Sequence, residues 1–329
     1  MTPILQVRNL RTRFKVRNRF VYAVNGVSFS VHQGETLGIV GESGCGKSVT
    51  MMSILQLLPP SAEIEGGEVL FQGKNLLDMK PNQLRKLRGS KISMIFQDPM
   101  TSLNPVVNIG TQLSEPLIYH RKFSKSNALD YSAELLDMVG VTDCRGKLKD
   151  YPYQLSGGMR QRVMIAMALA CQPELIIADE PTTALDVTIQ AQIVDLLRQL
   201  KKEIGMVMIW ITHDLGLIAG LANRILVMYA GYIVEEASVD DIYEDPRHPY
   251  TQALIKAVPS IKRVDTQRLY TIGGSPPDLA IRPDFCPFLP RCSYVQDICR
   301  KQSPILSTVS DPKRSSHRIA CWVDIRNGK

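Results

Sequence analysis

The 329-residue sequence contains no long hydrophobic run, since no segment approaches the ~18 consecutive apolar residues that a membrane-spanning helix requires. The chain is therefore not expected to cross a membrane by itself. Its first residues also lack a basic start followed by an apolar stretch, so the sequence predicts no secretory signal. Both absences favour a protein that stays in the cytoplasm.

Positive charge is not concentrated in any one stretch, although the formal net charge is +7. The densest basic segment, residues 8–19, is interrupted by Phe14 and Val16 and is typical of an exposed strand and turn. A basic stripe with interleaved aromatic residues, which would favour nucleic-acid binding, is missing. We therefore expect no nucleic-acid partner, and a mildly basic surface that faces other anionic groups.

Close cysteine pairs are absent as well. The last four of the seven cysteines, Cys286, Cys292, Cys299 and Cys321, follow the spacing C-x5-C-x6-C-x21-C. Structural zinc sites favour pairs about two to four residues apart. A reducing compartment argues against a disulfide framework, which leaves metal ligands or free thiols. Thiolates in a set of four suit Zn²⁺ or an iron–sulfur cluster.

The chain has the composition of a globular protein, with 44% hydrophobic and 22% charged residues. Short apolar runs alternate with helical spacing, which predicts an α/β fold with a largely parallel central sheet. The expected elements are hairpins within 4–40, buried strands at 37–40, 175–178, 207–211 and 225–229, and helices at 47–58, within 100–155 and at 158–170. Prolines cluster after Pro246. This change predicts a main domain at 1–260 and a small, loop-rich, cysteine-containing region at 261–329.

A glycine-rich segment fits the pattern G-x-x-x-x-G-K-[ST] between a predicted strand and a predicted helix. Its residues are Gly41, Glu42, Ser43, Gly44, Cys45, Gly46, Lys47 and Ser48, followed by Val49. Glycines let backbone N–H groups wrap phosphates, and the helix N-terminus adds partial positive charge. Lys47 should reach the β- and γ-phosphates of a nucleoside triphosphate, and the Ser48 hydroxyl should ligate Mg²⁺. A glycine-rich turn with an incidental lysine would leave the flanking strand and helix unexplained.

Two acidic residues, Asp179 and Glu180, end the predicted strand at 175–178. An aspartate at the end of a buried strand beside a phosphate loop can hold Mg²⁺, usually through water. Glu180 would then polarise the attacking water as a general base. Strands often end in solvated carboxylates, so this pair indicates a site only together with the segment at 41–48.

A second anion site is predicted at Leu155, Ser156, Gly157, Gly158 and Met159, because a serine and two glycines directly precede a helix. One nucleotide needs only one phosphate loop. A second site therefore suggests action on a different nucleotide. The alternative is a capped helix start after a proline, which the same residues also satisfy.

With the motif at 155–159 lying between the motifs at 41–48 and 179–180, the sequence resembles the ABC transporter ATPases over about residues 4–260. The resemblance implies a P-loop, RecA-like core with an antiparallel β subdomain and a helical subdomain at about 98–160. It also implies that residues 155–159 contact the γ-phosphate of ATP held by the opposite subunit of a dimer.

Further residues match family positions. Gln97 is implied to contact Mg²⁺ or the attacking water, and His213 to contact the γ-phosphate. Another match, the loop formed by Ala184, Leu185 and Asp186, is implied to line the dimer interface. Phe14 matches the aromatic residue that stacks on adenine, with Tyr22 as the alternative. The implied reaction is in-line attack of water on the γ-phosphorus, supported by Glu180, His213, Gln97 and Lys47.

Residues 93–105, 178–188 and 247–251 resemble the oligopeptide/dipeptide importer branch of the family. This implies a peripheral subunit at the cytoplasmic face of the membrane that couples ATP hydrolysis to peptide uptake. The implied partners are a second ATPase subunit, usually a different one although a homodimer is chemically possible, two transmembrane permeases and, indirectly, an extracytoplasmic peptide-binding protein. Nickel importers carry similar strings, so a nickel or other small-solute importer is the alternative.

The similar importer subunits carry a like cysteine tail, in some cases associated with a [4Fe–4S] cluster. We rank this cluster first for the last four cysteines, Zn²⁺ second, and free thiols or disulfides third; His317 could replace one ligand. Cys45 lies near a predicted helix N-terminus, a position that is expected to lower a thiol pKa.

Two other protein classes fit less well. A soluble ABC ATPase of DNA repair or translation would need a long coiled-coil insertion between residues 48 and 155, or a second cassette, and the sequence has neither. A metal-sensing regulatory subunit would show degraded catalytic positions, whereas Lys47, Asp179, Glu180 and His213 are all in place.

Overall fold

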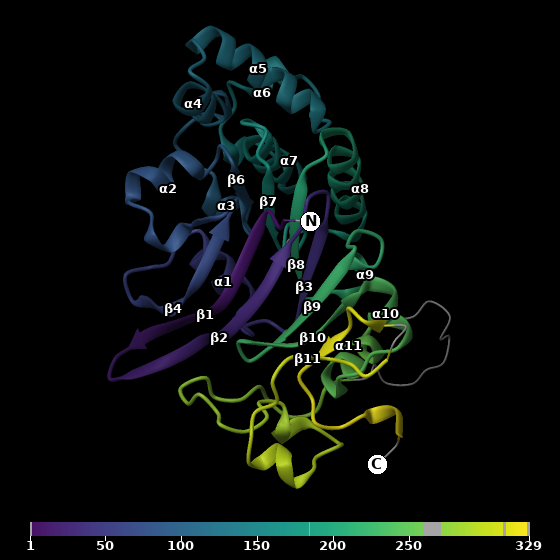
Figure 1. The fold of residues 1–329 in the computed structure, drawn as a ribbon. Helices are drawn as coiled ribbons and strands as arrows, with labels where there is room; N and C mark the ends of the chain where they lie inside the picture. The colour runs from purple at the N-terminus through teal and green to yellow at the C-terminus, as the bar shows by residue number, and fades with distance from the viewer. Residues whose placement is uncertain (1, 184, 259–270, 312–313, 328–329) are drawn as a thin grey trace. The chain divides into compact units, whose positions relative to one another are not determined.

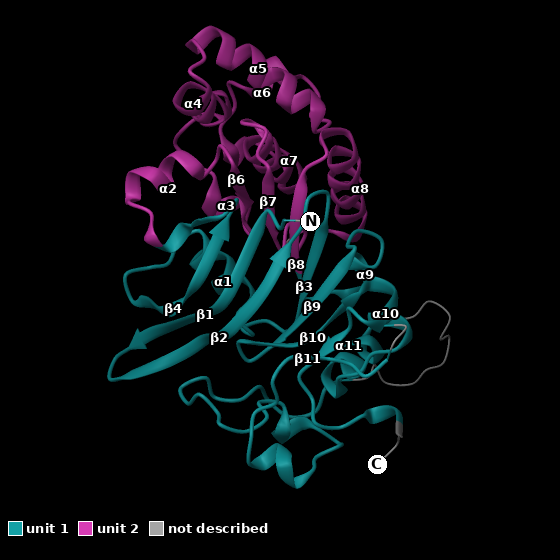
Figure 2. Ribbon diagram, viewed as in Figure 1, with its two compact units in different colours: residues 1–77, 212–329 teal, residues 78–211 magenta. Residues whose placement is uncertain are grey.

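The computed structural model describes residues 2–183, 185–258, 271–311 and 314–327. The chain forms two compact units, Met1–Leu77 with Thr212–Lys329 (unit 1) and Asp78–Ile211 (unit 2) (Figures 1 and 2). The predicted boundary near residue 260 lies outside the described residues.

Unit 1 contains an antiparallel sheet with strand order β2-β1-β4-β5 (Figure 1). Its strands are β1 (Leu5–Val16), β2 (Arg19–Val31), β4 (Ala62–Phe71) and β5 (Lys74–Asn75). The basic segment at 8–19 is thus a strand and turn, as predicted. Arg17 turns the chain between β1 and β2 with a φ of 53°, in the left-handed region.

Unit 1 also contributes strands to a second sheet, in the order β11-β12-β10-β9-β3. They are β3 (Thr36–Val40), β9 (Arg224–Tyr229), β10 (Tyr232–Ser238), β11 (Ser307–Thr308) and β12 (Arg318–Ile319). The β3 and β9 strands are parallel, and every residue of β3 is buried, which explains the apolar run at 37–40. The helices of unit 1 are α1 (Lys47–Ile54), α9 (Leu215–Ile218), α10 (Val239–Glu244) and α11 (Pro249–Ala257).

Helix α1 is shorter than the predicted helix at 47–58. It ends at Ile54, before the two prolines at 59 and 60, because Gln56 adopts a left-handed φ of 49°. A left-handed residue cannot continue the α-helix. The local backbone conformation ends this helix, and the prolines come too late to do so.

Unit 2 is built on three parallel strands, β6 (Ile92–Ile95), β7 (Leu175–Asp179) and β8 (Val207–Thr212), paired β6 with β7 and β7 with β8. Its helices are α2 (Pro81–Leu87), α3 (Pro99–Ser102), α4 (Ile109–Arg121), α5 (Lys125–Met138), α6 (Cys144–Lys147), α7 (Gly157–Leu169) and α8 (Val187–Ile204). The parallel strands and the helices within 100–155 confirm the predicted α/β arrangement. No helix in the described part of the chain is both long and apolar enough to cross a membrane.

Short 3-10 turns complete the chain, at η1 (Leu76–Asp78), η2 (Pro152–Gln154), η3 (Leu289–Arg291), η4 (Asp297–Arg300) and η6 (Ile325–Asn327). Three of them lie in the C-terminal part, which is otherwise mostly loop. This agrees with the loop-rich character that its prolines predict.

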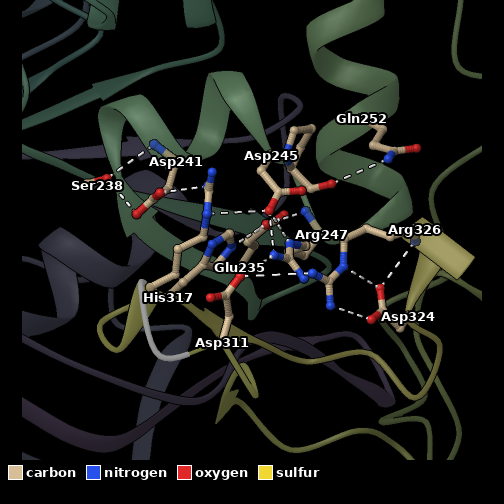
Figure 3. A network of polar contacts seen from close by, with 12 residues as sticks. Glu235, Ser238, Asp241, Asp245, Arg247, Gln252, Asp311, His317, Asp324 and Arg326 are labelled. Atoms are coloured by element: carbon tan, nitrogen blue, oxygen red, sulfur yellow. Dashed lines mark hydrogen bonds and ion pairs between the residues drawn. The ribbon is translucent and has the colours of Figure 1, made fainter.

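A buried carboxylate joins the C-terminal part to the rest of unit 1. Glu235, on β10, accepts backbone N–H bonds from Arg247 (2.6 Å) and His248 (2.9 Å), and its Oε1 lies 2.7 Å from His317 Nε2 (Figure 3). The side chains of Glu235 and His317 are fully buried. This hydrogen bonding satisfies a carboxylate that would otherwise be costly to bury.

Replacing Glu235 by Ala should lower the free energy of unfolding by about 3 kcal/mol, because it leaves buried donors without an acceptor. Chemical denaturation of the full chain measures the effect. The control is Glu68→Ala, which removes an exposed ion pair with Arg8 and should change stability by less than about 0.5 kcal/mol. Equal effects of the two substitutions would contradict the stabilising role of Glu235.

Candidate nucleotide site

The glycine-rich segment lies between β3 and α1, as the sequence predicts. Ser43 and Gly44 are exposed at the tip of the loop, whereas Cys45, Gly46 and Lys47 are buried. The loop turns tightly, since the Cys45 N–H donates to the Glu42 carbonyl at 3.3 Å. An exposed tip of successive backbone N–H groups at a helix start is an arrangement that binds phosphate.

Two glycines of this loop have no room for a side chain. A Cβ on Gly41 would lie 2.2 Å from the Met228 carbonyl oxygen, and one on Gly46 would lie 2.3 Å from that of Ala23. Gly46 also has a φ of +103°, which L side chains rarely adopt. The loop can therefore take this path only with glycine at both positions.

Lys47 lies under the loop and is 4% exposed. Its Nζ donates to the carbonyl oxygens of Gly41 (2.7 Å) and Glu42 (3.0 Å). The ammonium group is thus held inside the curve of the loop. From there it can serve the phosphates that the loop would bind.

Cys45 does not have the low thiol pKa that its position near a helix N-terminus predicts. The side chain is 6% exposed, and burial raises its pKa even though Lys47 and nearby backbone donors act in the opposite direction. The predicted lowering of its pKa is therefore wrong. The cost of removing the thiolate from water outweighs its stabilisation by the helix N-terminus, because a thiolate is poorly stabilised in a buried position.

In unit 2, the structure brings together two predicted site residues, Gln97 and Glu180. The Gln97 Nε2 donates to Glu180 Oε2 at 3.2 Å, across the adjacent ends of β6 and β7. Thr183 Oγ1 donates to the same oxygen at 2.8 Å. Sequence reasoning missed Thr183, which is a common residue type with no distinctive spacing.

The backbone at Glu180 is strained. Glu180 has a φ of 45°, and its N–H donates to the Ile211 carbonyl at 3.0 Å, which continues the pairing of β7 with β8. A non-glycine residue in the left-handed region carries a conformational cost and is often found at functional sites. Asp179 precedes it as the last residue of β7 and is 3% exposed.

The serine–glycine segment forms the start of α7. Ser156 is the N-cap, and its hydroxyl accepts the N–H of Met159 at 3.3 Å. Leu155 is buried, whereas Ser156 and Gly157 are exposed. The first turn of α7 contains no acidic residue, so its positive end is not neutralised locally.

Within unit 2, the loop predicted to line the dimer interface and the start of α8 lie against the serine–glycine segment. A Cβ on Gly158 would lie 2.9 Å from Ile189, and one on Gly157 would lie 3.8 Å from Leu185. Asp186 caps α8 by accepting the N–H of Ile189 at 2.9 Å. Ala184, which belongs to the same predicted loop, lies outside the described residues.

Three remaining candidates belong to unit 1. His213 is exposed and directly follows β8, while Phe14 on β1 and Tyr22 on β2 are half-buried. The guanidinium of Arg282 lies 4.5 Å from the centroid of the Tyr22 ring. One face of Tyr22 is therefore occupied by a protein side chain.

The four C-terminal cysteines lie around one small cavity, with a volume of about 10 Å³. Burial, with smaller contributions from the neighbouring cysteines, raises the pKa of Cys286 to about 11 and that of Cys321 to about 12. The sulfurs of Cys292 and Cys321 each accept a backbone N–H bond, at 3.3 Å from Tyr294 and 3.5 Å from Val323. The sequence pattern thus identified four thiols that converge in the fold.

Convergence does not by itself form a metal site. Over the described ranges, no group of three or more His, Cys, Asp or Glu side chains is placed to hold a metal ion. The suggestion that His317 replaces a cysteine ligand is wrong, because its Nε2 contacts Glu235 and its side chain does not line the cavity.

Comparisons with known proteins agree with this architecture. Residues 24–183 match the ABC transporter family, and residues 234–299 match the oligopeptide/dipeptide transporter C-terminal region. The ATP-binding cassette MJ0796, solved as a dimer bound to ADP and Pi, aligns with a TM-score of 0.65 and 30% identity over 71% of this chain and 98% of that one. These matches confirm the predicted P-loop α/β fold.

Two relatives that align over nearly their whole length have a higher sequence identity to this chain. A probable peptide ABC transporter ATP-binding protein of Sinorhizobium fredii is 51% identical over 97% of this chain and 94% of its own length. The dipeptide transport ATP-binding protein DppD of Bacillus subtilis is 48% identical over 98% of this chain and 95% of its own. The chain therefore belongs to the ABC transporter ATP-binding proteins and is an ABC-type ATPase. Within that class it carries the C-terminal region of the oligopeptide/dipeptide branch.

At neutral pH, Cys45 should be alkylated at least about tenfold more slowly than the half-buried Cys144, because burial limits the access of the reagent to Cys45. Burial raises the pKa of both thiols, so access makes the difference. Mass spectrometry of the time course measures both rates. MgATP should slow labelling of Cys45 further, and the labelled protein should lose ATP binding. Equal rates at Cys45 and Cys144, or ATPase activity after complete labelling of Cys45, would contradict this account.

Proposed function

We propose that the chain is the ATP-hydrolysing subunit of an importer for di- and oligopeptides, peripheral to the cytoplasmic face of the membrane. The observation that carries this proposal is that an intact set of ATPase motifs is joined to an oligopeptide/dipeptide transporter C-terminal region. The relatives named above, which align over nearly the whole chain, bear names of peptide transport.

Unit 1 supplies the residues that bind adenine and the phosphates. Adenine stacks on Phe14, which is favoured over Tyr22 because Arg282 already covers one face of the Tyr22 ring. The backbone N–H groups of residues 41–49 wrap the phosphates, and Lys47 contacts the β- and γ-phosphates. Ser48, Asp179 and Gln97 are the residues that would hold Mg²⁺, whose charge neutralises the phosphates when it is bound.

Hydrolysis depends on the carboxylate of Glu180. Gln97 and Thr183 both donate to one of its oxygens, so its orientation is fixed before substrate arrives. Glu180 orients the water that attacks the γ-phosphorus and accepts its proton, and His213 contacts the γ-phosphate. A preset carboxylate lowers the entropic cost of placing that water.

The exposed start of α7 acts on a second nucleotide. Ser156, Gly157 and Gly158 offer an uncompensated helix N-terminus to the γ-phosphate held by a partner ATPase, and Asp186 lines the same interface. Both half-sites are chemically complete in this chain. A homodimer can therefore function, although pairing with a different ATPase subunit is the arrangement that the family resemblance favours.

Unit 2 offers a surface for the membrane partners. A groove of about 1020 Å³ is lined by residues of α4, α5 and α6, among them Ile118, Tyr119 and Leu129. Two permease subunits, each presenting a short helix to an ATPase, would dock at the helical subdomain. The extracytoplasmic peptide-binding protein then contacts the permeases and not this chain.

The Glu180→Gln variant should retain MgATP binding and lose at least about 10²-fold of ATPase activity, because the amide cannot accept the proton. Size-exclusion chromatography with MgATP should show a stable dimer. In vesicles that contain the permeases and receive peptide-binding protein, the native subunit should drive uptake of a labelled dipeptide and the variant should not.

Undiminished turnover in this variant would remove Glu180 from the mechanism. Uptake of Ni²⁺ in place of the dipeptide by the native complex would favour the nickel-importer alternative. ATP turnover that no permease alters would favour a non-transport ATPase.

We also propose that Cys286, Cys292, Cys299 and Cys321 hold a [4Fe–4S] cluster. Support comes from four thiols around one cavity and from the N–H bonds that two of the sulfurs accept, a feature that tunes such clusters. The cavity has to widen for the cluster, and the thiols have to lose protons. The cluster would supply a covalent crosslink between the C-terminal loops.

Anaerobically purified protein should contain about four iron and four sulfide per chain and show a broad visible absorbance band. Cys321→Ser should lose the iron and the band, whereas Cys144→Ser, in unit 2, should keep both. One bound zinc without colour would establish the second-ranked metal instead. Metal-free protein in both variants and in the native chain would leave the cysteines as free thiols.

A further inference from the structure

An arginine of the C-terminal region contacts the phosphate loop. The Arg291 guanidinium makes two parallel bonds to the Glu42 carboxylate, Nη1 to Oε2 at 2.6 Å and Nη2 to Oε1 at 2.9 Å. The Arg291 side chain is 2% exposed and that of Glu42 is 28% exposed. A bidentate arginine–carboxylate pair of this kind is stronger and more directional than a single ion pair.

The guanidinium is held from several sides. Its Nε donates to the Gly273 carbonyl at 2.9 Å, and Nη2 also lies 3.2 Å from the Ile272 carbonyl. Nη1 lies 3.4 Å from the Tyr229 hydroxyl. The Glu42 carboxylate raises the pKa of Arg291, so the group stays charged. A rigid, permanently charged group is thus presented to the loop.

Glu42 is fixed through its backbone as well. Its N–H donates to the Tyr250 hydroxyl at 2.9 Å, and its carbonyl accepts from Lys47 Nζ at 3.0 Å. The rings of Tyr229 and Tyr250 pack on Phe288, with centroids 5.1 and 5.4 Å away, three residues before Arg291. The second residue of the phosphate loop is therefore held by groups that follow it in sequence by about two hundred positions or more.

The pairing matters because of charge. Glu42 places a carboxylate on the loop that has to receive a triphosphate, and like charges at close range in a partly buried site repel strongly. Arg291 cancels that charge and keeps the carboxylate directed at itself. Lys47 and the loop N–H groups are then left to act on the phosphates.

We propose that Arg291 is a positioning residue of the nucleotide site, which holds and neutralises the Glu42 carboxylate so that the phosphate loop accepts MgATP. The C-terminal region is then a working part of the ATPase. The proposal needs only that the loop binds nucleotide, and it holds whichever solute is transported and whichever metal the cysteines hold.

The test is a double-mutant cycle on the full chain, with a fluorescent MgATP analogue as the probe. Arg291→Gln should weaken binding by about tenfold, because it leaves an unpaired carboxylate on the loop. Glu42→Gln should change binding by less than about threefold, and the double variant Glu42→Gln/Arg291→Gln should return to within about threefold of the native affinity. Such a rescue is not expected if Arg291 only stabilises the fold.

Two further variants provide controls. Arg314→Gln breaks another ion pair of the C-terminal region, with Asp241, and should leave nucleotide binding unchanged. Arg291→Lys keeps the charge but loses the two parallel bonds, so it should bind MgATP less tightly than the native chain and more tightly than Arg291→Gln. Thermal unfolding of each variant separates lost affinity from lost structure.

The proposal is overturned if Glu42→Gln weakens binding about tenfold or more, or if the losses of the two single variants add in the double variant. Should Arg291→Gln alone prevent folding, the double variant Glu42→Gln/Arg291→Gln decides the question. A folded double variant with near-native binding supports charge compensation, because it has no carboxylate left to neutralise, and a loss of about tenfold or more contradicts it.

Discussion

The phosphate loop is packed so tightly between two strands that its backbone touches theirs. A Cβ on Gly41 would meet a carbonyl oxygen of β9, and one on Gly46 would meet a carbonyl oxygen of β2. The Gly231 N–H, in the turn between β9 and β10, also donates to the Cys45 carbonyl at 2.9 Å. Both sheets of unit 1 therefore have to be in place before the loop can take its path, and the loop's shape depends on the fold around it more than on its own sequence.

Charge pairing is the second constraint in unit 1. Several acidic side chains of the preceding strands and loops pair with basic side chains of the C-terminal region, and two pairs, Arg19 with Asp278 and Arg247 with Asp311, have the opposite sense. Glu236 pairs with Arg318 at 2.9 Å, and Asp241 with Arg314 at 2.6 Å, beside the pair that Glu42 forms with Arg291. The loop-rich C-terminal region buries apolar side chains, among them Phe288, Val323 and Ile325. The ion pairs add directional attachment to this apolar packing.

Much of the fold and part of the candidate site could be predicted, because the patterns that indicate them are contiguous in the sequence. Buried parallel strands such as β3 and β7 are continuous apolar runs, and the motifs at 41–48 and 155–159 are contiguous, so spacing alone identifies them. The convergence of four distant cysteines was predicted because cysteine is rare and chemically distinctive. Contacts between ordinary residues far apart in sequence left no such signal. Neither the Thr183 bond to Glu180 nor the His317 contact with Glu235 could be read from spacing.

The error at Cys45 has the same origin. Position at a helix start is visible in the sequence and favours a thiolate, but burial is set by the packing of distant chain segments and acts in the opposite direction. A pKa is the balance of both, and only the local part can be read from a motif. Predictions from sequence are therefore weakest where a residue's chemistry depends on how deeply the rest of the fold covers it.

Two consecutive residues connect the phosphate loop of unit 1 with its cysteine cavity. Arg291 ends η3, and the next residue, Cys292, lines the cysteine cavity and donates its N–H to the Leu289 carbonyl of the same turn at 3.4 Å. Arg291, which contacts Glu42, and Cys292, which lines the cysteine cavity, are therefore held by the same short turn of backbone. The phosphate loop and the cysteine cavity thus share one structural element of the C-terminal region, although they lie in different parts of the sequence.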